Sequence, residues 1–470
     1  MKISNKPFAA SVPGRSLMEC RMSYVFKGLK PYDHQMKTIK FYLANKRCYN
    51  LSDLGTGKTA PSIWLADILL KAGHIKKVLV ICPLSIMDTV WRNEILQLIP
   101  EAKVSIVHGT RDKRIERLAE DSSFFLTNTD APRSYLNELL AAKFDLVIID
   151  EVDSFGNATS QRSKACQIIT SQAKSVIGLT GTPTADSPVT AFGICKVVNP
   201  DGLPCRHLTK WKSLTMYEIA QHIWIPSDNC ERIVHEAMQP AIRFKLEMCG
   251  DIPDMVNKYV EFRMNPVQEK MHKQMKKEQL IELQDSEIIA SNAAVKFSKL
   301  LQISGGCVYD SDGNTIVTSI KDRTDYIVHT QKQAGQVIVF VQFTHIIKEI
   351  LKNIPRAKAI YGDVSPKARA LTINEFKDGK FDILIAQPRV AAHGLNLQFC
   401  NHIIFWGPIL GNSYYRQAIG RIRRSGQKRV QVVINMVSSI EERKIYAKLE
   451  TKEVSSRFLL GLYEDIKNER

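Results

Sequence analysis

The stretch SDLGTGKT, Ser52–Thr59, combines two glycines, a lysine and a threonine at the spacing of a phosphate-binding loop. Such a loop needs backbone N–H groups that face the phosphates, glycines that let the chain turn, and a following helix whose N-terminus adds its dipole. The full pattern G-x-x-x-x-G-K-[ST] has Ser52 in place of its first glycine. We expect Lys58 to bind the β- and γ-phosphates and Thr59 to ligate Mg²⁺. The alternative is a chance glycine-rich turn.

Two acidic residues end an apolar run further along the chain, in LVIIDEVD. Asp150 is suited to ligate Mg²⁺ through water, and Glu151 to orient and deprotonate an attacking water. The alternative is a strand followed by an ordinary acidic turn. Because a phosphate loop precedes this run, the sequence favours the catalytic interpretation.

A basic run, QAIGRIRRSGQKR, occupies Gln417–Arg429. Arg421 and Arg424 are three residues apart, so we expect them to share a helix face. Their planar guanidinium groups would suit a transferring γ-phosphate, as arginine fingers do. The alternatives are a solvated basic face and contact with a nucleic-acid backbone.

Short apolar runs rich in β-branched residues indicate the strands that must position these side chains. Continuous apolar strands separated by helical patterns are typical of parallel sheets covered on both faces. Two sets of such strands predict an α/β fold with two lobes, and they place the glycine loop and the arginines on different lobes. The first set is 48–52, 77–82, 124–128, 145–150 and 175–180, and the second is 337–343, 382–386, 402–406 and 430–437.

The amino-acid composition indicates which class of partner the protein binds and which cellular compartment it occupies. The formal net charge of the 470 residues is +17, which suits a polyanion, most commonly nucleic acid. Ten scattered cysteines without a C-x-x-C pair or zinc spacing favour a reducing compartment. We expect a cytoplasmic protein without membrane association, because no signal-peptide core or run of about 20 apolar residues occurs. No coiled-coil heptads occur, and a monomer is favoured.

The segment between the two strand sets is richer in charge, methionine and helix formers. Within it, Val267–Leu283 predicts a helix with several lysines, either a solvated face or a surface that touches DNA. We therefore predict five parts: an N-terminal extension, the first lobe, a helical insertion with linker, the second lobe, and a C-terminal helical tail. Their boundaries are 1–24, 25–198, 199–323, 324–450 and 451–470.

Taken in order, the motifs resemble those of the SNF2-like branch of superfamily 2 helicases and translocases. The resemblance covers about Leu29–Val437. Asp153 stands where many members carry histidine, and Gly394 and Asn396 lie in a variant of the usual G-I-N. The matching stretches are LKPYDHQ, DLGTGKT, VLVICPLSIMDTVWRNEI, LTNTD, IIDEVD, LTGTPT, VIVFVQFTH, AAHGLNLQFCNHIIFW and YRQAIGRIRRSGQ.

The resemblance implies two RecA-like parallel-sheet lobes with an ATP cleft between them, and ATP and Mg²⁺ as cofactors. It implies catalytic roles for Lys58, Asp150, Glu151, Arg421 and Arg424, with Thr59 and Asp150 on the metal. Thr180 and Thr182 would couple hydrolysis to DNA grip, and Pro83, Ser85, Thr127 and Gln342 would contact nucleic acid. The nucleotide would be bound by Gln35, Gly55, Thr56, Gly57, Lys58, Thr59, Gly394, Asn396 and Gln417.

The resemblance also implies a DNA-dependent ATPase or helicase. Such a motor would move on duplex or branched DNA and remodel forks or junctions by branch migration or unwinding, in replication, recombination or repair. The chain resembles members of compact, stand-alone type from bacteria and phages, and a phage-encoded member is expected in the host-cell cytosol. Two alternatives stay open: an RNA helicase, and a non-catalytic ATP-dependent DNA clamp.

Overall fold

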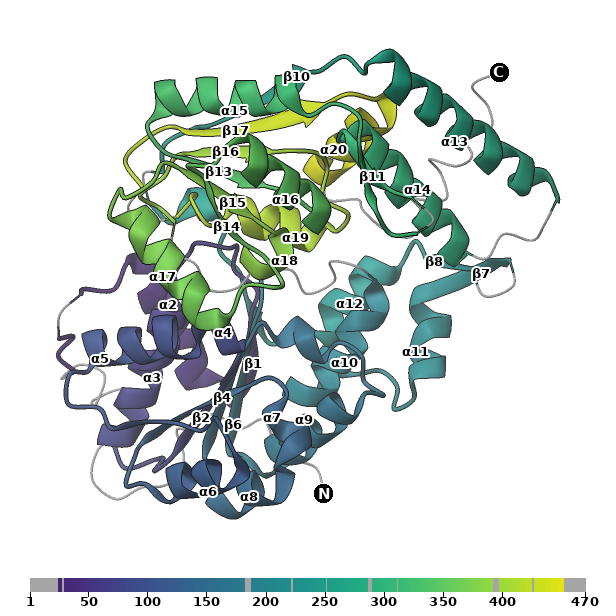
Figure 1. Cartoon of the computed structure of the whole chain (residues 1–470). Helices are drawn as coiled ribbons and strands as arrows, with labels where there is room; N and C mark the ends of the chain where they lie inside the picture. The colour runs from purple at the N-terminus through teal and green to yellow at the C-terminus, as the bar shows by residue number, and fades with distance from the viewer. Residues whose placement is uncertain are drawn as a thin grey trace. The chain divides into compact units, whose positions relative to one another are not determined.

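A computed structural model describes residues 24–27, 29–181, 187–220, 223–250, 252–285, 290–310, 312–391, 397–424 and 427–451. The chain divides into two compact units, Met1–Asp251 and Ile252–Arg470, and each contains its own parallel sheet (Figure 1). The two-lobed α/β architecture predicted from the apolar runs is confirmed. Within the described ranges, no helix has both the length and the apolar character needed to cross a bilayer.

Seven parallel strands form the sheet of the first unit, in the order β3-β4-β2-β5-β6-β1-β9. Leu79 and Ile81 pack into the apolar core on one face, and Val78 and Val80 into the core on the other. Burial on both faces explains the continuously apolar sequence. The strands are β1 (Arg47–Asn50), β2 (Val78–Cys82), β3 (Val104–Ile106), β4 (Phe124–Asn128), β5 (Leu146–Asp150), β6 (Ser175–Leu179) and β9 (Ala241–Ile242).

Helices cover both faces of this sheet. Those that supply side chains to the core containing Val78 are α2 (Asp33–Ala44), α3 (Thr59–Lys71), α4 (Leu84–Ile86), η1 (Met87–Arg92, a π-helical turn) and α5 (Asn93–Leu98). The opposite core receives α6 (Arg111–Ala119), α7 (Ala131–Ser134), α8 (Leu136–Ala142), η2 (Val152–Phe155), α9 (Gln161–Gln172) and α10 (Pro188–Val198).

The end of the first unit differs from the helical insertion expected from residue 199 onward. Trp211 is fully buried, and its indole N–H donates to the Pro188 carbonyl at 3.1 Å, which anchors this segment to α10. Its last strand, β9, joins the sheet beside β1. The elements are η3 (Pro200–Gly202), α11 (Leu208–Thr215), the hairpin β7 (Met216–Ala220) and β8 (Ile223–Pro226), α12 (Cys230–Ala237), β9 and η4 (Leu246–Met248).

Six parallel strands form the sheet of the second unit, in the order β10-β17-β16-β13-β15-β14. Edge strand β10 also lies in the segment expected to be helical; most of its residues are exposed, so it lacks the apolar run that marks a strand in the sequence. The strands are β10 (Met255–Glu261), β13 (Val337–Phe340), β14 (Lys358–Ile360), β15 (Ile383–Ala386), β16 (His402–Phe405) and β17 (Gln431–Val437).

The remaining elements of the second unit include the lysine-bearing helix predicted at Val267–Leu283, which the structure shows as α13 (Pro266–Asp285). It packs against α14 (Ala290–Ser304), and a small antiparallel pair follows, β11 (Cys307–Tyr309) and β12 (Thr315–Val317). The others are α15 (Lys321–Ala334), α16 (Thr344–Asn353), α17 (Pro366–Lys377), α18 (Pro388–Ala391), α19 (Asn412–Ile419) and α20 (Ile440–Thr451).

Candidate nucleotide site

The glycine loop joins the carboxyl end of β1 to the N-terminus of α3. Gly55 and Gly57 both have positive φ, +84° and +72°, a conformation that disfavours any residue with a Cβ. A Cβ on Gly57 would lie 2.8 Å from Nε2 of Gln35. The glycines are therefore needed for the turn itself and, at Gly57, for close approach of a neighbouring helix.

Lys58 stands immediately before α3, and its ammonium lies over the loop. The Nζ atom donates to the carbonyls of Ser52 at 2.7 Å and Asp53 at 3.1 Å. Because the first N–H groups of a helix have no partner within the helix, the start of α3 supplies both donors and a positive dipole end. The lysine and the helix start together make this loop suited to a phosphate chain.

Ser52, which replaces the first glycine of the phosphate-loop pattern, has a structural partner. Its Oγ accepts the Phe244 N–H at 3.1 Å, and the neighbouring Asp53 N–H donates to the Phe244 carbonyl at 2.9 Å. Asp53 Oδ2 also accepts the Leu246 N–H at 3.3 Å. The loop is thus hydrogen-bonded to the stretch that follows β9, which is the end of the first unit.

Gln35 and its neighbour His34 fix the loop from α2. Gln35 donates from Nε2 to the Gly57 carbonyl at 3.1 Å and accepts the Tyr32 N–H on Oε1 at 3.0 Å. His34 Nε2 lies 2.8 Å from the Thr56 carbonyl. The structure therefore places Gln35 as a support of the loop backbone, whereas its predicted role in binding the nucleotide stays a prediction. His34 was missed because nothing in the sequence distinguishes it apart from its position beside Gln35.

The two acids of the LVIIDEVD run lie at the same edge of the sheet as the loop, because β5 and β1 are parallel and separated only by β6. Asp150 accepts the Trp91 indole N–H on Oδ2 at 2.9 Å and the Glu151 N–H on Oδ1 at 3.0 Å. Glu151 has φ +51°, which is uncommon outside glycine. Its Oε2 is buried and has no hydrogen-bond partner among the described residues, so it is available to a water or ligand.

Burial and mutual repulsion shape the charge of these acids. Burial, together with the charge of Glu151, raises the pKa of Asp150 to about 6, against the opposing effects of the Trp91 hydrogen bond and the Lys58 charge. Burial and Glu151 likewise raise the pKa of Asp153 to about 7, and the Thr180 hydroxyl donates to its Oδ1 at 3.3 Å. A cation at this cluster would relieve the repulsion.

The donor set fits a magnesium ion that is shared with phosphates. In the described part of the chain, no group of three or more His, Cys, Asp or Glu side chains could hold a metal by itself. Magnesium in nucleotide enzymes is usually held by one or two carboxylates together with substrate phosphates. Asp150, at the end of β5, and Thr59, at the start of the helix after β1, lie at the same sheet edge and supply a carboxylate and a hydroxyl of that kind.

Replacing Gly57 by alanine is expected to weaken nucleotide binding about tenfold, equivalent to about 1.4 kcal/mol. The matched control is Gly73→Ala. Both glycines have φ +72°, so both variants bear about 1–2 kcal/mol of left-handed strain. Only Gly57→Ala also displaces Gln35, because nothing lies within 4 Å of a Cβ at Gly73. The measurement is the affinity for a fluorescent ADP; equal affinities of the two variants would contradict the loop geometry.

Asp153→Asn is expected to stabilise the nucleotide-free protein increasingly as the pH rises. A carboxyl whose pKa is raised on folding favours the folded state below its unfolded value near 3.8 and loses that contribution as the pH rises through about 7. Asparagine does not titrate and keeps an oxygen for Thr180. The Tm difference between variant and wild type, measured without divalent cations from pH 4 to 8, should grow up to about pH 7. A constant difference would refute the raised pKa.

The second unit holds Gln417, Arg421 and Arg424, but the expected shared helix face of the two arginines is wrong. The helix α19 ends at Ile419, and the following turn begins at Gly420. Arg421 is buried, with its carbonyl accepting the Leu397 N–H at 3.3 Å, and Arg424 donates from Nε to the Gly420 carbonyl at 2.9 Å. Because both arginines follow the end of the helix, they do not share a helix face. Gln417 lies within α19 and is buried.

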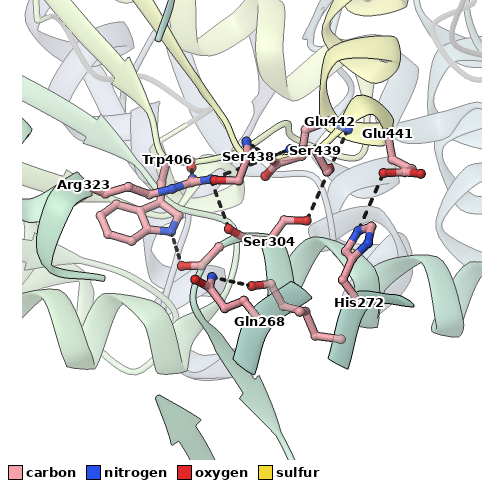
Figure 2. Close-up of polar contacts among 11 residues, drawn as sticks. Gln268, His272, Ser304, Arg323, Trp406, Ser438, Ser439, Glu441 and Glu442 are labelled. Atoms are coloured by element: carbon pink, nitrogen blue, oxygen red, sulfur yellow. Dashed lines mark hydrogen bonds and ion pairs between the residues drawn. The ribbon is translucent and has the colours of Figure 1, made fainter. Parts of the chain in front are cut away.

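A buried polar network in the second unit joins α14 and α15 to the ends of β16 and β17 (Figure 2). Arg323 donates to the carbonyls of Trp406 and Ser304 and to Ser438 Oγ, the last two at 3.1 and 2.7 Å. Glu442 lies 3.6 Å from the same guanidinium and accepts the backbone N–H of Ser438. The Trp406 indole N–H donates to the Gly305 carbonyl at 3.0 Å, so the network extends to the loop after β16.

The helix α13 is attached to the same network. Glu441 lies 2.7 Å from Lys276 and 3.6 Å from His272, and burial lowers the pKa of that histidine. Of the four lysines on this helix, Lys276 pairs with the buried Glu441, and Lys273 is exposed and lies 3.7 Å from Glu269. Lys270 and Lys277 are exposed. Any nucleic-acid contact by this helix is left to the exposed lysines.

A model of the SNF2-related domain matches residues 34–305, more than half of the chain, and a model of the helicase conserved C-terminal domain matches residues 319–426. The chain belongs to the SNF2-related family. The predicted resemblance is confirmed.

Relatives of this SNF2-related chain include protein p41 of Acyrthosiphon pisum secondary endosymbiont phage 1, 27% identical over 84% of this chain and 88% of p41. The ATP-dependent helicase/translocase YwqA of Bacillus subtilis is 23% identical over 93% of the chain, which spans about half (49%) of YwqA. Mouse DNA repair and recombination protein RAD54-like is 22% identical over 94% of this chain and 67% of its own. The solved Sulfolobus solfataricus SWI2/SNF2 ATPase core in complex with dsDNA is 23% identical over 93% of each chain, with a TM-score of 0.44.

The residues expected to contact nucleic acid have different surroundings in this SNF2-related fold. Ser85 is exposed and follows the buried Pro83 at the start of α4. Thr127 is fully buried, and its hydroxyl contacts Tyr135 and the Val107 carbonyl, so a direct contact through its side chain is excluded by this packing. Gln342 is half-buried and accepts the Leu410 N–H at 2.9 Å.

Three predicted residues, Thr182, Gly394 and Asn396, lie outside the described residues. Thr180, the other residue expected to couple hydrolysis to DNA grip, is buried and contacts Asp153 as given above. The residues predicted to be catalytic in the first unit thus gather at one sheet edge, and those predicted in the second unit, Arg421 and Arg424, lie just after α19.

Proposed function

We propose that this chain is a DNA-dependent ATPase that uses Mg²⁺-bound ATP to move on duplex or branched DNA. The observation that carries the proposal is the edge of the first sheet. There the glycine loop with Lys58 and the acidic pair Asp150 and Glu151 lie at the carboxyl ends of parallel strands, and Glu151 keeps a buried oxygen without a partner among the described residues. This donor and acceptor set suits hydrolysis of a phosphoanhydride.

Each residue has a role in that reaction. The loop N–H groups and Lys58 bind the phosphates, and Asp150 with Thr59 would hold the metal. Glu151 orients the attacking water and accepts its proton through Oε2. The magnesium, when bound, neutralises charge on the phosphate oxygens. Arg421 and Arg424 of the second unit are proposed to stabilise the charge that develops on the γ-phosphate.

Three observations favour DNA as the partner. The net charge of +17 suits contacts with a phosphate backbone, which require no sequence readout. The exposed Ser85 lies just after β2, at the same sheet edge as the nucleotide residues. Among the relatives, RAD54-like is named as a DNA repair and recombination protein and YwqA as a helicase/translocase. Remodelling of forks or junctions is the finer part of the proposal, and it rests on these relatives.

Steady-state ATP hydrolysis tests the substrate. The wild-type protein would be measured alone and with single-stranded DNA, plain duplex, a four-way junction, and RNA, and Lys58→Ala would serve as the blank. Stronger stimulation by the junction than by duplex supports remodelling of branched DNA, and equal stimulation indicates a duplex translocase. Stimulation by RNA alone would show that the substrate is RNA rather than DNA. Hydrolysis no faster than that of Lys58→Ala would favour the remaining alternative, a non-catalytic ATP-dependent DNA clamp.

A further inference from the structure

Trp91 connects the segment after β2 to the acid at the end of β5. It lies in the π-helical turn η1, and its side chain is fully buried in the core that also contains Cys82 and Ile86. Strands β2 and β5 are neighbours, with Ile81 opposite Ile149, so the chain beyond Cys82 passes beside Asp150. Single π-turns are rare and are frequent at functional sites.

The indole N–H fixes one of the two oxygens of Asp150. Trp91 Nε1 donates to Oδ2 at 2.9 Å, while the Glu151 N–H donates to Oδ1 at 3.0 Å. An indole is a donor only, so the direction of this bond is not in question. Each carboxylate oxygen has a second lone pair, and both oxygens remain able to accept from a metal-bound water or to ligate a metal.

We infer that Trp91 is a positioning residue whose indole N–H holds the Asp150 carboxylate in the orientation that binds magnesium. The inference rests on the proposed function, because that function makes Asp150 a metal ligand. Groups that hydrogen-bond to metal-ligating side chains orient those ligands, and removing one typically costs 10–100-fold in metal affinity or activity. Loss of the indole N–H is therefore expected to raise the Mg²⁺ concentration that nucleotide binding requires, and to leave the protein's direct contacts with the nucleotide unchanged.

The chain offers a matched control in Trp64. Trp64 is buried in the same core as Trp91, on α3, yet its Nε1 has no hydrogen-bond partner among the described residues. Trp64→Phe and Trp91→Phe both remove part of a buried ring and leave a similar cavity. Only Trp91→Phe also removes a donor from Asp150, so the difference between the two variants isolates the hydrogen bond.

The test is a magnesium titration of fluorescent ADP binding with the full chain. For Trp91→Phe we expect the half-saturating Mg²⁺ concentration to rise at least about tenfold, with binding in EDTA unchanged. Trp64→Phe should match wild type in both. At saturating Mg²⁺, Trp91→Phe should recover most of its ATP turnover, a recovery that general damage to the fold would not give.

The outcomes separate the inference from the function on which it rests. If wild type binds nucleotide with a clear magnesium requirement and Trp91→Phe has the same requirement, the positioning role is wrong and the proposed function stands. If wild type shows no magnesium-dependent binding, both are wrong. Should Trp91→Phe lack a cooperative thermal transition, Trp91→Met, whose flexible apolar chain fills irregular space without an N–H donor, takes its place in the same titration.

Discussion

Lys58→Ala is expected to reduce ATP hydrolysis by about 10²–10³-fold or more. The reason is that it removes a fixed positive charge that would stabilise the negative charge developing on the phosphates in the transition state. The loop itself should persist: its turn depends on Gly55 and Gly57, and its backbone is held by Gln35 and Ser52. DNA binding should therefore remain close to wild type. The measurements are steady-state hydrolysis and DNA affinity on the same preparation.

Lys71→Ala is the control for this experiment. Lys71 lies at the other end of α3, half-exposed and paired with Asp67 at 2.6 Å, so it alters the charge of the same helix without touching the loop. Its hydrolysis should stay near wild type. Normal turnover by Lys58→Ala would refute the phosphate-loop assignment.

Arg421→Ala and Arg424→Ala are each expected to lower turnover by about 10³-fold while ATP binding is kept. The reason is that an arginine finger contributes mainly to the transition state, in which charge spreads over the transferred phosphoryl group. The two side chains leave the turn after α19 in different surroundings, one buried and one hydrogen-bonded to the Gly420 carbonyl. Single-turnover hydrolysis and ADP affinity measure the two effects separately.

The exposed Arg429 gives the control for the arginines. Arg429→Ala removes one positive charge a few residues further on, outside the turn that holds Arg421 and Arg424. It should affect salt-dependent DNA binding at most, because a backbone contact contributes to affinity and not to the chemical step. If Arg421→Ala or Arg424→Ala changed DNA affinity alone, that arginine would not be a finger.

Strands buried on both faces were predictable from the sequence. Each of the nine apolar runs corresponds to a strand of one of the two sheets, because strands buried on both faces are predominantly apolar. The sequence prediction also missed the three-residue strands β3 and β14. The short strand β9 and the exposed edge strand β10 were not predictable. With two residues, or with mainly polar ones, they are determined by pairing with β1 and β17 rather than by a pattern of their own.

In the candidate site too, some features were predictable from local sequence and others depend on contacts between residues distant in sequence. The types and spacing of Lys58, Asp150 and Glu151 predicted one site, and strand order places them at one sheet edge. What the sequence could not give was the supporting contacts. Trp91 and His34 act through single hydrogen bonds to residues distant in sequence, and Thr127 is buried by Tyr135, which no local pattern reveals.

The hydrogen bonds between the phosphate loop and the end of the first unit couple the movement of the loop to the chain that follows β9. Leu51 and Asp53 donate to the carbonyls of Ile242 and Phe244, and the Ser52 hydroxyl accepts from Phe244. A displacement of the loop must therefore either break these bonds or pull the chain that leads toward Ile252. For the proposed motor, this means that a force arising at the phosphates would act on the backbone beyond β9 through main-chain hydrogen bonds, without relay through side-chain packing.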